Sequence, residues 1–227
     1  MKIKIAALVV SLVMAFSVFA QSKEDQRLAN SASVMKELLA GDKGLPKNVV
    51  DQSLCVLIFP SVKKVAVGIG GSYGRGVLVC RKGEKMDGSW GAPVMYALDQ
   101  GSLGVQLGST ATDFVMAVVH TKGVDAILNG KMKLGANAAA AAGPTGADAT
   151  GYNAAAMSSD VLTYSRSKGL FAGVSLQGAS IEPDNDANKK LYGKEIGIKE
   201  IVNGSQEAPA AAKPLVSLLD QTSPSHK

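Results

Sequence analysis

The chain has 227 residues, of which 46% are hydrophobic and 19% charged, and its formal net charge is +5. This length suits one domain with a sizeable core. The weakly basic balance argues against a nucleic-acid-binding domain. Because the sequence contains only two histidines and two cysteines, their spacing assembles no zinc or haem ligand set, and we expect no metal or cofactor.

The N-terminus has the pattern of a secretory signal peptide. Lys2 and Lys4 form a short positive region, residues 5–19 are almost entirely apolar, and Val18 and Ala20 place small side chains at a cleavage site. The apolar run is shorter than the roughly 20 residues that span a bilayer, which disfavours an uncleaved anchor. We therefore expect residues 1–20 to be removed and the mature chain to reach the periplasm or cell envelope, or to be secreted.

Basic residues concentrate in one segment of the mature chain. Removing Lys2 and Lys4 lowers the net charge from +5 to +3, whereas residues 61–85 alone carry +5 and the rest therefore about −2. This asymmetry predicts a surface that binds phosphate, although solvated strand ends are the commoner explanation of such a run. The basic residues of the segment are Lys63, Lys64, Arg75, Arg81, Lys82 and Lys85.

Cys55 and Cys80 are the two cysteines of the chain, and both lie in apolar runs typical of strands. Export would place them in an oxidising compartment, where a disulfide can form. Such a bridge would stabilise the fold by about 3 kcal/mol in the chain-entropy model. Two buried free thiols are the alternative, because the sequence does not show whether the two strands are adjacent.

The first part of the mature chain has helical periodicity. Apolar side chains, among them Leu28, Met35 and Leu39, recur at helical spacing and predict an amphipathic helix over residues 24–39. This helix would pack on the domain or lie on a membrane surface. A second short helix is predicted at residues 46–53.

Short apolar runs broken by glycine follow, and they predict an antiparallel meander. Its first strands are expected at residues 54–59, 65–70 and 76–81, with a turn at 71–75. Further strands are expected at residues 94–99, 103–108, 113–120, 131–142, 161–167 and 170–181, and helices at 123–128 and 185–192. The predicted class is therefore α+β, with a curved antiparallel sheet or partly closed barrel and flanking helices. Residues 21–205 would form this domain, and residues 206–227 an appended helix and polar tail.

Two patterns that suggest catalysis or calcium binding fail on their context. Residues 70–74 match G-x-S-x-G around Ser72, and His120 lies downstream, but a turn and a strand follow where a nucleophile elbow needs a helix. Hydrolysis therefore rests on Ser72 and His120 alone, and we expect no enzyme. Asp184 and Asp186 begin an EF-hand-like spacing, but Lys189 stands where the calcium loop requires glycine. We expect one of these aspartates to cap the helix that follows.

The glycine-rich segment 64–76 resembles the first motif of the SYLF family, which reads K-A-G-F-G-V-G-G-x-Y-G-x-G in bacterial members. Further blocks of the same family follow in the family's order. They are Asp87–Trp90 with Ala92 and Pro93, Thr112–Val115, Ala142–Gly146, and Tyr164–Gly178 followed by Asn188 and Leu191–Gly193. The resemblance covers nearly all of residues 28–203. Cys55 and Cys80 are not part of the family pattern.

The resemblance implies a lipid-binding protein rather than an enzyme. Eukaryotic SYLF domains bind phosphoinositides with the help of an amphipathic N-terminal helix, and one fungal branch also binds actin. Lys64 and Lys168 fall on lysines of the family motifs. In a bacterial envelope the available acidic lipids are phosphatidylglycerol and cardiolipin.

We therefore expect an exported, non-enzymatic protein that binds acidic phospholipid at a membrane surface. Each basic residue would contribute about 1 kcal/mol near an anionic surface, less in high salt. The alternative is a structural or interaction protein of the envelope, or a surface antigen, with a protein partner. The expected phosphate contacts are Lys63, Lys64, Arg75, Arg81, Lys82 and Lys168.

Overall fold

The structure of the protein, a computed structural model, describes residues 21–41, 44–67, 69–103, 108–143, 158–168, 176 and 178–225. The expected signal peptide at residues 1–20 lies outside the described residues. So does most of the segment 169–177, which belongs to the last family block.

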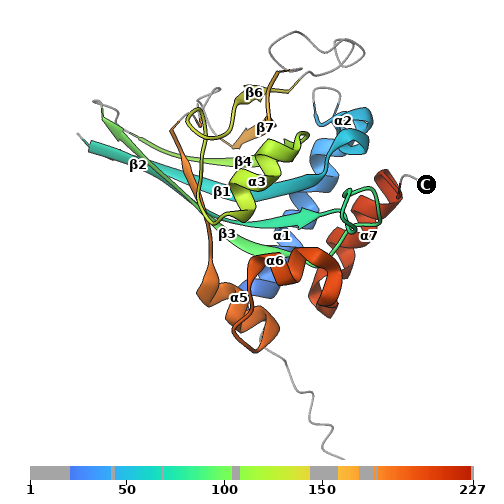
Figure 1. The fold of residues 1–227 in the computed structure, drawn as a ribbon. Helices are drawn as coiled ribbons and strands as arrows, with labels where there is room; N and C mark the ends of the chain where they lie inside the picture. The colour runs from blue at the N-terminus through green and yellow to red at the C-terminus, as the bar shows by residue number, and fades with distance from the viewer. Residues whose placement is uncertain are drawn as a thin grey trace, which may run out of the picture.

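A strongly curved sheet forms the centre of the described fold (Figure 1). Its strand order is β5-β8-β3-β2-β1-β4-β7-β6, and all neighbours are antiparallel except the parallel pair β6–β7. The predicted α+β class with a curved sheet is confirmed, and the β6 edge makes the sheet mixed. The strands are β1 (Cys55–Val67), β2 (Ile69–Cys80), β3 (Val94–Leu103), β4 (Gly108–Val118), β5 (Met132–Lys133), β6 (Ala140–Ala142), β7 (Val161–Lys168) and β8 (Ser180–Pro183).

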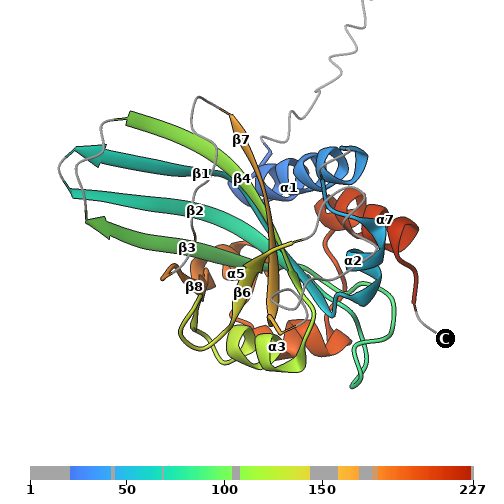
Figure 2. The same ribbon diagram turned by 90° about the horizontal axis from the view of Figure 1, so that it is seen from above.

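Helices flank both faces of the sheet, and each face has its own hydrophobic cluster. One cluster joins the sheet to α1, α2 and α7, and the other joins it to α3 and η2. Figure 2 shows β1–β4 extending together beyond these helices on one side of the molecule. The helices are α1 (Lys23–Ala40), α2 (Lys47–Gln52), α3 (Thr121–Leu128), α5 (Asn185–Tyr192), α6 (Ile198–Glu200) and α7 (Lys213–Thr222), with short helical turns η2 (Ile201–Ser205) and η3 (Ala210–Ala212).

Helix α1 confirms the helix predicted at residues 24–39. A capping box starts it, because the Ser22 hydroxyl accepts from the Asp25 amide while the Asp25 carboxylate accepts from the Ser22 amide. Leu28 and Met35 are fully buried in the cluster that α1 shares with the sheet and α7, and Ala32 and Leu39 are partly buried against it. The apolar face of α1 therefore packs on the domain, which is the first of the two alternatives, and the domain covers the surface that would have faced a membrane.

The glycine-rich segment forms part of a long hairpin rather than a turn. The strand predicted at 54–59 and the first part of the one predicted at 65–70 form a single strand, β1, whereas residues 69 and 70 already belong to β2. The turn predicted at 71–75 is wrong, because these residues lie within β2. Gly71 and Gly74 lie inside β2: Gly71 pairs with β1 on one side and β3 on the other, and Gly74 pairs with Leu98 of β3 where the β1–β2 register shifts. The strand predicted at 131–142 is two short strands, β5 and β6, while the helix predicted at 185–192 is α5.

A disulfide joins Cys55 at the start of β1 to Cys80 at the end of β2. The two residues are direct partners in the antiparallel register, and both are buried in the cluster on the α3 face. Strand pairing thus supplies the adjacency that the sequence left open, and it favours the bridge over two free thiols.

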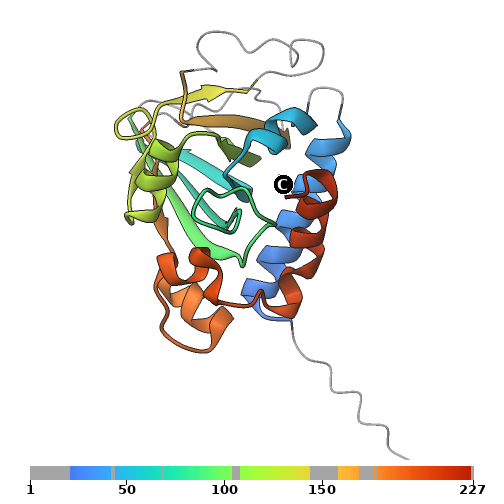
Figure 3. The ribbon, with the colours of Figure 1, turned by 45° about the vertical axis from the view of Figure 1, so that its right-hand side comes forward.

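The C-terminal segment belongs to the core and is not appended. Helix α7 lies beside α1 (Figure 3), and its Leu215 and Leu219 are fully buried in the same cluster as α1. Beyond the helix, Ser223 is also fully buried. The expectation that residues 206–227 lie outside the domain core is therefore wrong for the part that the structure describes.

Removing the disulfide should lower the free energy of unfolding by about 3 kcal/mol, because a loop of 25 residues regains its freedom in the unfolded chain. The comparison is denaturant unfolding of the wild type and of the double variant Cys55→Ala/Cys80→Ala, each with and without reductant. The variant should be insensitive to reductant and should match the reduced wild type. A reductant effect of equal size in both proteins would contradict a native bridge.

Leu219→Ala should destabilise the protein by about 3 kcal/mol, since it leaves a cavity in the core. Ser217→Ala, an exposed position in the same helix, is the matched control and should change the free energy of unfolding by less than about 0.5 kcal/mol. Equal, small effects of the two substitutions would mean that α7 is a dispensable appendage.

Candidate anion-binding site

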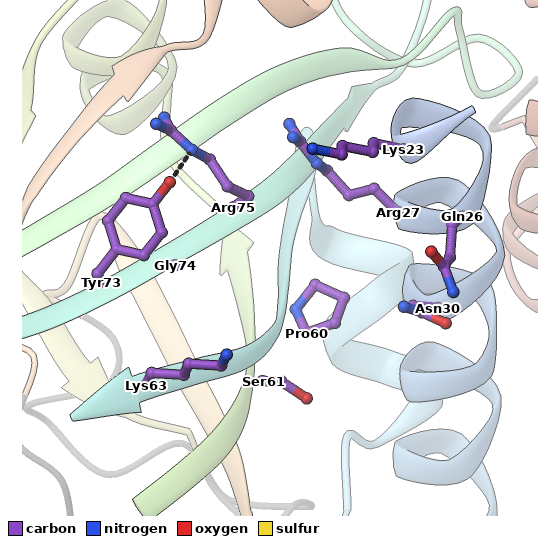
Figure 4. Close-up of a pocket in the computed structure, with 10 residues that line it drawn as sticks. All are labelled: Lys23, Gln26, Arg27, Asn30, Pro60, Ser61, Lys63, Tyr73, Gly74 and Arg75. Atoms are coloured by element: carbon purple, nitrogen blue, oxygen red, sulfur yellow. Dashed lines mark hydrogen bonds between the residues drawn. The ribbon is translucent and has the colours of Figure 1, made fainter. Parts of the chain in front are cut away.

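A cavity of about 250 Å³ opens between the first half of α1 and the middle of the β1–β2 hairpin (Figure 4). In this view the side chains of α1 approach it from one side and those of β1 and β2 from the other. It is lined by Lys23, Gln26, Arg27, Asn30, Pro60, Ser61, Lys63, Tyr73, Gly74 and Arg75.

A β-bulge in β1 shapes the wall of the cavity. The register of β1 shifts by one residue between Phe59 and Val62 relative to β4, so Pro60 and Ser61 together stand opposite Asp113. Ser61 has φ 52°, in the left-handed region that few residues other than glycine adopt. Its amide donates to the buried Asp113 carboxylate at 2.8 Å, which holds the bulge in place.

The same carboxylate links the bulge to the rest of the fold. Arg166 of β7 donates to Asp113 at 2.7 Å and also pairs with Glu37 of α1. The bulge, β4, β7 and α1 are thus connected by one chain of charged groups, and this fixes α1 relative to the strand that carries the cavity wall.

Four cationic side chains surround the cavity: Lys23 and Arg27 from α1, Lys63 from β1 and Arg75 from β2. The carboxylate of Asp184 pairs with two of them, because its Oδ2 lies 3.2 Å from Arg27 Nη1 and 3.5 Å from Arg75 Nη1. The ten residues that line the cavity include these four cations and no carboxylate, so its wall is positively charged.

Tyr73 stands at the rim, with 46% of its surface exposed. The Arg75 guanidinium carbon lies 4.8 Å from the centre of its ring, and Arg75 Nε donates to its hydroxyl. A second hollow also borders on Tyr73 and Lys63, and Asp99 and Gln100 are among its other lining residues. Tyr73 thus presents an amphipathic ring beside a cluster of positive charge.

This arrangement suits a phosphate group. Arginine binds phosphate oxygens through paired N–H donors, and lysine adds a mobile point charge. Gln26 and Asn30 of α1 bring amide groups to the same wall, so a phosphate with a small polar substituent would find both charge and neutral hydrogen-bonding groups.

Of the expected phosphate contacts whose side chains the structure describes, Lys63 and Arg75 line this cavity. Lys64 follows Lys63 in β1 and points to the opposite face, because successive strand residues alternate. Lys82 is exposed beyond the end of β2 and does not line the cavity. Lys168 ends β7, and its side chain lies outside what the structure describes.

Arg81 is not placed to contact a lipid, and this expectation is corrected. It is buried, its guanidinium donates to the carbonyls of Ser53 and Gly88 and to the Ser223 hydroxyl, and it stacks 4.5 Å from the centre of the Trp90 ring. Burial lowers the pKa of Arg81 below its ordinary value. Arg81 therefore joins α2, the loop after β2 and the C-terminal segment.

Lys23 and Arg27 were not among the predicted contacts. Both lie in α1, four residues apart and thus on one side of the helix, with Gln26 and Asn30 beside them. The sequence shows that Lys23 and Arg27 are four residues apart. It does not show that they face β2, since Arg27 and Arg75 lie almost fifty residues apart in the chain.

The residues of the rejected catalytic and calcium motifs have structural surroundings. Ser72 is buried inside β2, with no helix after it, so it forms no nucleophile elbow. His120 is the exposed residue before α3. Asp184 caps α5 through the Ala187 amide, as the capping hypothesis predicted.

The described residues offer neither a metal cluster nor a membrane crossing. Between residues 21 and 225, the described histidine, cysteine and carboxylate side chains form no group of three that could hold a metal ion. None of the helices described there combines the length and the apolar character that crossing a bilayer requires.

The sequence profile of Ysc84, described as "Las17-binding protein actin regulator", matches residues 99–222. Protein YSC84 of Saccharomyces cerevisiae is 32% identical over 207 residues, which are 90% of this chain and 43% of that protein. LAS seventeen-binding protein 3 of the same species is 32% identical over 210 residues, 90% of this chain and 44% of that protein. SH3 domain-containing YSC84-like protein 1 of Homo sapiens is 33% identical over 180 residues, 79% of this chain and 52% of that protein.

This chain spans about half the length of the relatives that it matches. The profile nevertheless covers more than half of the chain itself, and the relatives align with most of it. The chain therefore belongs to the Ysc84 family, also called SYLF, as its glycine-rich and Ser-Lys-Gly-Leu-Phe-Ala-Gly blocks predicted.

Proposed function

We propose that this protein binds acidic phospholipid head groups, without catalysis, in the cavity between α1, β1 and β2. The observation that carries the proposal is the convergence of Lys23, Arg27, Lys63 and Arg75 on one hollow from three separate elements. Bringing four like charges together costs electrostatic energy, and an anion bound among them would offset that cost.

A lipid head group fits this site better than a free anion for two reasons. The cavity is open to the surface, so a phosphate that remains attached to a bilayer can reach it. The half-exposed Tyr73 at its rim has the amphipathic character that favours the membrane–water interface. Phosphatidylglycerol, cardiolipin or a phosphoinositide-like head group would supply the phosphate.

We further propose that the protein acts after export, in the periplasm, in the cell envelope or as a secreted protein. The signal-peptide pattern of residues 1–20 supports this, and so does the buried Cys55–Cys80 disulfide, since such bridges persist in oxidising compartments.

Lys63→Glu should weaken binding to anionic vesicles by more than tenfold at low ionic strength, because it changes the charge beside the cavity by two units. Lys64→Glu is the matched control: it makes the same charge change one residue further along β1, on the opposite face. It should weaken binding much less. Flotation with vesicles of phosphatidylcholine, with and without phosphatidylglycerol, measures both effects, and the difference should narrow as salt is added.

Equal losses for Lys63→Glu and Lys64→Glu would mean that only the overall charge matters and that the cavity is not the site. Equal binding of the wild type to neutral and anionic vesicles would rule out the proposed recognition of acidic head groups. The thermal midpoints of both variants serve as the folding control.

A second candidate is a protein partner, which follows from the family description as a Las17-binding actin regulator. In this reading the protein would be an interaction component of the envelope or a surface antigen. Co-sedimentation of the purified protein with filamentous actin tests whether actin is this partner. Saturable, stoichiometric pelleting that persists in Lys63→Glu would favour a protein-binding surface separate from the cavity. The absence of pelleting would remove actin as the partner.

A further inference from the structure

We infer that Asp184 is an internal competitor of the anion that binds between Arg27 and Arg75, and that it limits the affinity of the site. The inference rests on the proposed function, because it concerns the same cavity. It assigns a role to a carboxylate that does not line the cavity itself.

Asp184 holds two arginines with a single oxygen. Its Oδ2 lies 3.2 Å from Arg27 Nη1 and 3.5 Å from Arg75 Nη1, so it bridges α1 and β2. The side chains of Asp184 and Arg27 are 14% and 13% exposed, which protects this pair from most solvent screening. Arg75 is 40% exposed and can turn toward the cavity more easily.

A carboxylate oxygen and a phosphate oxygen use the same N–H groups of a guanidinium. A phosphate entering the cavity must therefore share Arg27 and Arg75 with Asp184 or displace it. Asp184 and the phosphate are both negative and repel each other. This repulsion weakens the net attraction of the four cations for the phosphate. Within the folded chain, Asp184 thus already forms contacts with Arg27 and Arg75 that a bound anion would otherwise form.

Asp184 can be neutralised without removing its second role. Its other oxygen, Oδ1, caps helix α5 by accepting from the Ala187 amide at 3.2 Å. Asparagine is as good an N-cap as aspartate, so Asp184→Asn preserves the cap, removes the negative charge and replaces the oxygen that faces the arginines with an amide NH2 group. Serine is a second neutral N-cap, which makes Asp184→Ser an independent version of the same test.

Asp186 supplies the matched control. It is exposed, lies in the first turn of the same helix and carries the same charge. Asp186→Asn therefore changes the net charge of the protein equally, and no ion pair between Asp186 and the cavity arginines is seen among the described residues.

The full mature chain and its Asp184→Asn, Asp184→Ser and Asp186→Asn variants would be titrated with phosphatidylcholine vesicles containing phosphatidylglycerol at low ionic strength. The two Asp184 variants should bind about fivefold more tightly than the wild type, while Asp186→Asn should stay close to the wild type. Thermal midpoints of all variants would confirm that each is folded.

Whether neutralising Asp184 strengthens or weakens binding to anionic vesicles distinguishes a competitor from a positioning residue. If Asp184 instead positions the two arginines for the anion, its neutralisation should weaken binding, and that result would overturn the inference. Equal affinities of Asp184→Asn and Asp186→Asn would also overturn it, while leaving the lipid function intact if Lys63→Glu still weakens binding. A wild type that does not bind anionic vesicles would overturn the lipid function and this inference together.

Discussion

The bulge at Pro60 and Ser61 decides which face of the sheet every later side chain of β1 reaches. One extra residue in β1 places Lys63, and not Lys64, on the face that α1 covers. The buried Asp113 maintains this shift by accepting from the Ser61 amide, and Arg166 connects Asp113 to α1. This arrangement therefore positions the cavity wall, Lys63 and helix α1 relative to one another.

Arg75 and Arg81 illustrate how surroundings assign different roles to one residue type. Both belong to the basic segment, six positions apart along β2 and the residue that follows it. Arg75 is partly exposed beside the cavity, with Tyr73 and Asp184 as neighbours. Arg81 is buried among carbonyl groups and the Trp90 ring, where its charge is satisfied within the protein. A count of local charge cannot separate the two, because burial is a property of the folded chain.

Features with local causes could be predicted from the sequence, and features with long-range causes could not. Helix α1 has its own periodicity and capping residues, and α5 has its capping aspartate, so both were predicted within about two residues. The glycines of residues 71–75 predicted a turn, because glycine is more typical of turns than of strands. Pairing with β1 and β3 makes the segment a strand, and that pairing is not visible in the sequence. The burial of α7 and the meeting of Arg27 with Arg75 depend on contacts between distant segments.

The central claim is that an acidic head group binds at the cavity between α1 and the β1–β2 hairpin. Backbone NMR of the mature protein, titrated with a short-chain phosphatidylglycerol below its micelle concentration, tests this claim most directly. The largest shifts should fall on Lys23, Arg27, Lys63 and Arg75 and their neighbours, and a short-chain phosphatidylcholine should leave these signals unchanged. Shifts centred on the loop around Lys82, or equal shifts with both lipids, would contradict it.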